Sequence, residues 1–189
     1  YQKFEKKTKL VLNKMIKDDS DIEEGHILCF LPNISFCYQM KKSIITDIKN
    51  DDFDEANANA KKKIVMLQTS LEPNESFASF SNRLLKEYNS IEKSRIDENN
   101  NIVFVYFLPL VISGLSEGTA FSLIRTEFPK IKKLIFTTPF LESFNINNLS
   151  VVIDSGLFKE EQFNNKTCLN TSYEKQASQE SMLLRYGRL

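Results

Sequence analysis

The sequence predicts an α/β fold, doubly wound, with a mostly parallel sheet and helices on both faces. Two observations carry this prediction. Short apolar runs, bounded by glycine, proline or polar residues, alternate with longer segments whose apolar residues recur at helical spacing. The chain also has the size of one domain: of its 189 residues, 41% are hydrophobic and 26% are charged, which is enough to build a substantial core.

The first β-α unit is expected directly after Gly25. Residues 26–31 form an unbroken apolar run that ends at Pro32, the pattern of a strand buried on both faces of a parallel sheet. From Ile34 to Ile48 the apolar residues keep i, i+3, i+4 and i+7 spacing. This segment therefore predicts the crossover helix that connects two parallel strands.

The later segments repeat this alternation. Further strands are expected at residues 64–67, 102–107, 134–137 and 151–154, and further helices at residues 74–91, 117–127 and about 175–184. Two polar segments are expected to be solvent-exposed spacers, at residues 49–63 and 92–101. Residues 1–20 predict an amphipathic helix or linker that leads into the domain, which we place at residues 21–189.

Charge and glycine patterns exclude several kinds of functional site. The 25 basic residues balance the 25 acidic ones, so binding of an anion has to rest on a local cluster. The five glycines form neither a P-loop nor a dinucleotide-binding G-x-G-x-x-G. Because His26 is the only histidine, multi-histidine metal sites are excluded, and we expect it at a strand edge. We interpret four basic residues as solvated side chains at the entrance of a strand rather than as a patch that binds nucleic acid: Arg125, Lys130, Lys132 and Lys133.

Cysteine and hydropathy patterns favour a cytoplasmic protein without membrane contact. Cys29, Cys37 and Cys168 lack C-x-x-C spacing and are expected to be buried or free thiols rather than disulfides or zinc ligands. The longest apolar run, residues 102–112, is about half the length of a bilayer-spanning helix. The chain opens at Tyr1 without a charged and then apolar leader, and we expect it to be a piece of a longer protein.

Four blocks of sequence follow one another in a characteristic order. They read GHILCFLP at residues 25–32, LPLVISGL at 108–115, LIFTTPFLESFNINNLSVVIDSGL at 134–157 and KQASQESMLLRYGR at 175–188. In this order they resemble four motifs of DExH/DEAH-box RNA helicases: the strand G-x-I-L-V-F-L-P, the segment L-P-L-H-S-x-L, A-T-N-I-A-E-T-S with Y-V-I-D-S-G, and S-K-A-S-x-x-Q-R-x-G-R-x-G-R. The resemblance covers residues 22–48 and 102–188 and implies the second, C-terminal RecA-like domain of such an enzyme.

The resemblance implies roles for six residues. In this family the first RecA-like domain holds the P-loop and the metal-binding acidic box, and the second supplies arginines to the nucleotide and a surface to single-stranded RNA. Matching the motifs position by position implies nucleotide binding by Arg185, Arg188 and Asn147. It implies RNA binding by Thr138, Ser113 and Lys159. ATP and Mg²⁺ are then expected only when the first RecA-like domain is present, and no catalytic or metal-binding residue is expected in these 189 residues alone.

Departures from the motifs imply impaired ATP turnover. Ser181 and Met182 replace the signature's glutamine and first arginine, and Leu184 replaces its first glycine. Each lost electrostatic donor removes about 2 to 4 kcal/mol of transition-state stabilisation. Pro139 and Phe144 replace polar residues of the RNA-facing segment. The main expectation is therefore a degenerate domain that acts through RNA and protein partners.

Two alternatives stay open, an active ATP-dependent RNA helicase domain and a pure protein-interaction module. Residues 154–188 are most similar to the branch that contains the YTH-domain germline helicase and benign gonial cell neoplasm protein, which implies translational regulation in germline differentiation. Residues 50–101 have no counterpart in the family pattern. They are expected to be a surface extension or, through the apolar face of the 74–91 helix, a partner-docking element. Residues 67–71 also mimic the L-x-x-S-x-L segment, but the spacing to Thr138 favours residues 108–115.

Overall fold

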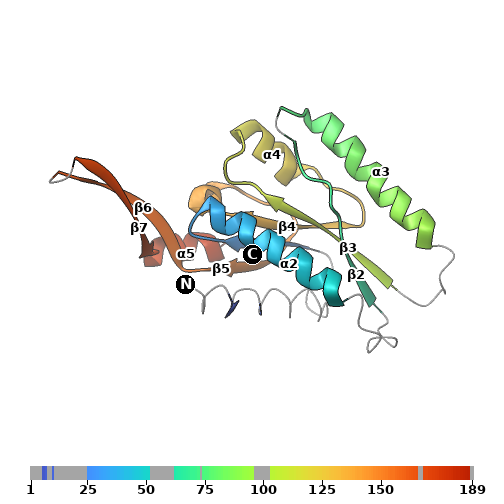
Figure 1. The fold of residues 1–189 in the computed structure, drawn as a ribbon, viewed down its shortest axis with the longest axis horizontal. Helices are drawn as coiled ribbons and strands as arrows, with labels where there is room; N and C mark the ends of the chain where they lie inside the picture. Colours follow the sequence, from blue (N-terminus) through green and yellow to red (C-terminus); the bar gives the residue numbers. More distant parts are fainter. Residues whose placement is uncertain are drawn as a thin grey trace.

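The computed structural model describes residues 6, 7, 10, 25–51, 62–72, 74–95, 103–165 and 168–187. The leading helix or linker expected at residues 1–20 lies almost wholly outside these residues, and so does Arg188. Within the described residues, five strands form one parallel sheet in the order β2-β3-β4-β1-β5 (Figure 1). The strands are β1 (His26–Phe30), β2 (Lys62–Met66), β3 (Val103–Val111), β4 (Ile131–Thr137) and β5 (Leu149–Asp154).

Helices cover both faces of the sheet, as the sequence predicts. On one face α2 (Ile34–Asp51) packs on the sheet, and on the other α3 (Phe77–Arg95) and α4 (Glu117–Arg125) do so. Successive residues of β1 contribute to the two cores in turn, because side chains of a strand point alternately to opposite faces. Leu28 belongs to the core under α3 and α4, and Cys29 to the core under α2. The architecture is the predicted doubly wound α/β fold.

Within the segment at residues 50–101, the described elements β2 and α3 are part of the folded domain, so the interpretation as a surface extension does not hold for them. It contains β2 and α3, which together form a β-α unit, and β2 pairs in parallel with β3 along the sheet edge. The strands that precede the two competing L-x-x-S-x-L segments, β2 and β3, are therefore both in the sheet, and residues 108–111 of β3 lie next to β4. On α3, Phe80 and Leu84 are fully buried, and Phe77, Tyr88 and Ile91 pack against the same core. The apolar face that suggested partner docking is thus occupied by the protein's own core.

A two-stranded antiparallel hairpin stands away from the sheet, at the left of Figure 1. It consists of β6 (Leu157–Asn164) and β7 (Leu169–Gln176), and it was not expected from the sequence. The helix expected from about residue 175 begins later, as α5 (Gln179–Tyr186), since Lys175 and Gln176 complete β7. The hairpin buries no strand face, so its sequence lacks the apolar alternation that marks a half-buried strand.

Buried polar groups meet at the amino end of the sheet. His26 begins β1, as expected, and its Nε2 lies 3.1 Å from Glu127 Oε2. Lys133 is fully buried and donates from Nζ to the carbonyl of Ile124 at the end of α4, over 2.7 Å. The expectation that Lys133 is solvated is therefore wrong, because the last carbonyls of a helix accept hydrogen bonds and favour a cation. Among the described helices, none is both long and apolar enough to cross a bilayer.

Candidate nucleic-acid interface

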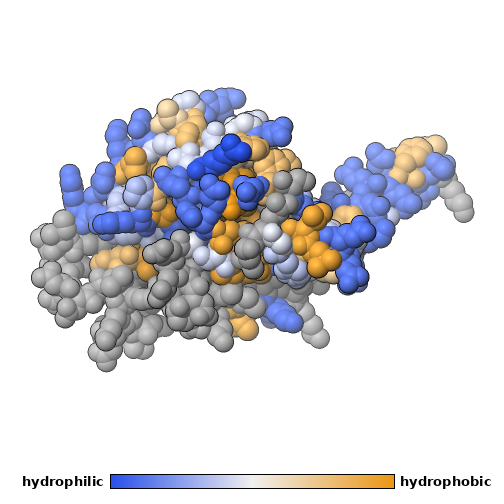
Figure 2. All heavy atoms as spheres, turned by 180° about the vertical axis from the view of Figure 1, so that it is seen from behind, coloured by the Kyte–Doolittle hydropathy of each residue, from blue (hydrophilic) through white to orange (hydrophobic). Residues whose placement is uncertain are grey.

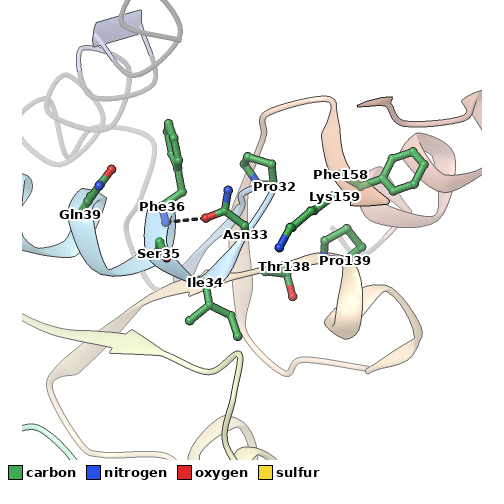
Figure 3. A pocket seen from close by; sticks show the side chains of 10 residues that line it. All are labelled: Pro32, Asn33, Ile34, Ser35, Phe36, Gln39, Thr138, Pro139, Phe158 and Lys159. Atoms are coloured by element: carbon green, nitrogen blue, oxygen red, sulfur yellow. Dashed lines mark hydrogen bonds between the residues drawn. The ribbon is translucent and has the colours of Figure 1, made fainter. Parts of the chain in front are cut away.

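A pocket of about 850 Å³ lies at the carboxyl end of the sheet. The turn between β1 and α2, the turn after β4 and the first residues of β6 form it (Figure 3). In open parallel sheets, ligands bind at this edge, where the loops that follow the strands meet. The lining residues are Pro32, Asn33, Ile34, Ser35, Phe36, Gln39, Thr138, Pro139, Phe158 and Lys159.

The first turn of α2 forms one wall of the pocket. Asn33 caps this helix, because its Oδ1 accepts a hydrogen bond from the backbone N–H of Phe36 over 2.9 Å. The same side chain donates from Nδ2 to Oε1 of Glu174 on β7, over 3.1 Å. The positive end of the helix dipole lies at this position and attracts anions. Asn33 therefore joins the hairpin to an anion-attracting helix end.

Ser113 and Thr138, which the sequence assigned to one surface, are in direct contact. Their hydroxyl oxygens are 3.0 Å apart, and the backbone N–H of Thr138 donates to Ser113 Oγ over 2.7 Å. Ser113 is only 3% exposed, whereas Thr138 is half-buried and lines the pocket. Gly114, with a φ of +89°, makes the turn that follows Ser113. Ser113 thus holds Thr138 in place, and Thr138 presents its side chain to the pocket.

Lys159 supplies the positive charge of the pocket. It lies on β6, and Figure 3 shows its ammonium group directed toward Thr138. Its side chain is 44% exposed, and its Nζ lies 3.8 Å from Glu161 Oε1, a long and weak ion pair. Glu174 lies opposite Lys159 on β7, and burial raises the pKa of its carboxyl group. The pocket thus combines an ammonium group, a hydroxyl-bearing turn and a helix N-terminus.

The Arg185 guanidinium is buried between α5, β5 and a short helix that follows Thr138, the 3-10 helix η2 (Pro139–Ser143). Its Nε donates to Glu142 Oε1 over 2.6 Å, and its Nη1 donates to Asp154 Oδ1 over 2.7 Å. The guanidinium carbon lies 5.2 Å from the centre of the Phe30 ring. Arg185 is 0% exposed, so its positive charge pairs with carboxylates inside the protein.

Asn147 lies apart from the other candidate residues. It is exposed in the turn that precedes β5, at the amino end of the sheet, whereas the pocket lies at the carboxyl end. The length of β5, roughly 20 Å for six residues at 3.3 Å each, separates the two ends. Thr138, Ser113 and Lys159 are therefore brought together, Arg185 lies beneath the same edge, and Asn147 is not part of this group. The prediction for Arg188 lies outside the described residues.

Asn33 and Glu142 were not expected to be functional residues. Asn33 has a recognisable signal, since an asparagine between the end of an apolar run and a helical pattern is a typical N-cap. The role of Glu142 has none, because its partner Arg185 is 43 residues away in the sequence. In the part of the chain that the structure describes, no group of three or more His, Cys, Asp or Glu residues is suited to hold a metal ion.

Hydrophobic surface gathers near the far end of the hairpin, as Figure 2 shows. Phe163 and Leu169 are the exposed hydrophobic residues there, with exposed fractions of 56% and 64%. Phe163 lies four residues after Lys159 on β6, so the two share one face of the ribbon. Four residues at 3.3 Å each place the ring roughly 13 Å from the cation along the strand, so a base can stack there while the phosphate of a different nucleotide meets the charge.

No protein-family profile and no curated protein sequence matches this chain. Two solved structures from Escherichia coli share its fold. The crystal structure of the DExH-box NTPase HrpB has a TM-score of 0.53 and 16% identity, and the match covers 98% of this chain and 16% of that chain. The crystal structure of the DEAH/RHA helicase HrpB has a TM-score of 0.52 and 15% identity, over 96% of this chain and 16% of that chain. The chain thus has a RecA-like fold and spans about one sixth of the length of these proteins.

Proposed function

We propose that this chain is the second RecA-like domain of a DExH-box-related protein and that it binds the phosphodiester backbone of single-stranded RNA at the carboxyl end of its sheet. The observation that carries the proposal is the pocket in which Lys159, Thr138 and the N-terminus of α2 converge. Ammonium groups, hydroxyl groups and helix N-termini are the partners that proteins use for phosphate oxygens. The RecA-like fold shared with DExH/DEAH-box helicases supports the same assignment.

This chemistry favours binding without preference for base sequence. Contacts to phosphate position a nucleic acid but read no bases. Phe163 adds a stacking surface, which every base can use because each has a π-face. The affinity is therefore expected to depend strongly on salt and weakly on the sequence of the RNA.

ATP turnover is impaired in this proposal. ATP and Mg²⁺ would bind in the P-loop domain of a longer chain, since the described residues offer no phosphate loop. Met182 lacks the charge that the helicase signature places at this position, and the Arg185 guanidinium already has two carboxylate partners. The protein then acts in post-transcriptional regulation as a binding partner of RNA and of other proteins. RNA-stimulated ATP hydrolysis well above background, by a chain that also carries a P-loop domain, would favour the active helicase instead.

The test is the fluorescence anisotropy of labelled oligo(U) titrated with the 189-residue chain at several salt concentrations. Lys159→Ala is expected to reduce the slope of log affinity against log salt by about 0.7, the value for one phosphate contact on a single strand. The matched control is Lys86→Ala, since Lys86 is an exposed lysine on α3. Equal losses in the two variants would show that the pocket is not the site. Absence of RNA binding by the unmodified chain at low salt would refute the function.

A further inference from the structure

We infer that Arg185 is a positioning residue for RNA binding: it clamps η2 to β5 and so fixes the turn that carries Thr138. This inference deepens the proposed function and depends on it. Arg185 stands where the helicase signature places a nucleotide-facing arginine, yet its guanidinium bridges Glu142 of η2 and Asp154 of β5. The residue is used to connect elements of its own domain.

The burial of the three charged groups holds Arg185 in place. The side chains of Arg185 and Asp154 are both 0% exposed, and that of Glu142 is 18% exposed. Turning the guanidinium outward would take this cation away from the carboxylate of Asp154, at a position that water does not reach. Removing one partner of a buried ion pair is strongly unfavourable for this reason. The inward position is therefore the stable one.

The clamp reaches Thr138 through η2. Glu142 lies four residues after Thr138, and the intervening Leu141 is fully buried and donates its backbone N–H to the Thr138 carbonyl over 3.4 Å. Ser181, which replaces the signature's glutamine, donates from Oγ to the same Glu142 oxygen over 2.6 Å. Two residues of the signature helix thus hold one carboxylate of the segment that follows Thr138.

The outer surface of α5 agrees with this role. Within α5, whose residues are all described, Arg185 is the only basic residue. The residues around it that face solvent are apolar: Leu183 is 63%, Leu184 55% and Tyr186 49% exposed. At positions 182 and 185, the two signature arginine positions within α5, the helix therefore presents no positive charge outward, and Arg185 and Ser181 contact η2 and β5.

The test uses a variant in which neutral side chains replace all three charged ones, Arg185→Met with Glu142→Gln and Asp154→Asn, which removes the clamp together with its carboxylates and raises the net charge by one, a change that alone would favour RNA binding. Its affinity for oligo(U) is expected to fall about tenfold, the equivalent of roughly one lost hydrogen bond to a charged group. Combined with Thr138→Ala it is expected to show no further loss, because both changes remove the same contact. Hydrogen exchange of the Leu141 and Phe144 amides is expected to accelerate relative to amides of β1.

Three results would overturn the inference. One is an affinity for RNA within twofold of the unmodified chain, measured on a variant whose circular dichroism shows that it is folded. Another is an additive effect with Thr138→Ala, which would mean a general structural role. The third is unchanged exchange of the η2 amides. If the unmodified chain does not bind RNA, the proposed function fails, and the amide exchange still decides whether Arg185 holds η2.

Discussion

Replacing Leu84 by alanine tests whether the β2–α3 unit is an integral part of the domain. Leu84 is fully buried in the core beneath α3. The change removes three carbon groups, worth about 2.4 kcal/mol at about 0.8 kcal/mol each. The cavity adds a further cost, so the free energy of unfolding is expected to fall by about 3 to 4 kcal/mol, within the usual range for buried leucines.

Leu85 provides the matched control, since it is the next residue on α3 and is 39% exposed. Leu85→Ala removes the same atoms from a site that water already reaches, and its cost is expected to be about 1 kcal/mol. Urea denaturation monitored by circular dichroism measures the loss in free energy of unfolding for both variants. The midpoint and the m-value are compared with those of the unmodified chain. Equal costs in the two variants, or a lower m-value in Leu84→Ala because α3 unfolds separately, would refute the reasoning.

Three further predictions concern the buried interior. Burial, followed by the charge of Lys133, lowers the pKa of His26, so the unfolded chain takes up a proton first as the pH falls below about 6.5. The free energy of unfolding should therefore decrease from pH 7 to pH 5, and urea denaturation of His26→Gln should lack this decrease. Gly25→Ala should destabilise by about 1 to 3 kcal/mol or more, because a Cβ there would lie 2.8 Å from the carbonyl oxygen of Asn148, whereas Gly118→Ala in α4 should stabilise slightly in thermal melts. A thiol reagent should label Cys168 in the native chain and the other two cysteines only in urea, as mass spectrometry would show, since burial raises their pKa values.

The buried strands could be predicted because burial on both faces leaves a continuous apolar run. This holds for β1, all of whose residues are buried. The run at residue 102 was predicted to end at residue 107, yet β3 continues through Pro109 to Val111. The N–H of Ile112 points toward β4, so the nitrogen of Pro109 faces the opposite side, beyond the last residue pair of β2 and β3. A proline is tolerated in this strand because no partner strand requires its N–H there.

The hairpin and the charge network could not be predicted in the same way. The strands β6 and β7 are stabilised by pairing with each other, and polar residues on both faces of a strand give no periodic signal. The resemblance implied an RNA-facing role for Ser113 and for Thr138 but not their contact, which arises because loops after neighbouring parallel strands meet at one edge. The inward direction of the Arg185 side chain could not be predicted from the sequence, because it depends on carboxylates that are distant in the sequence.

The double use of Asn33 has a consequence for engineering this domain. One amide group terminates a helix and also anchors a protruding ribbon through Glu174. Transplanting the ribbon onto another RecA-like scaffold would therefore require the asparagine to be transferred with it. A tilt of the ribbon, from a crosslink or a bound macromolecule, would pull on the helix cap and so alter the wall of the cavity.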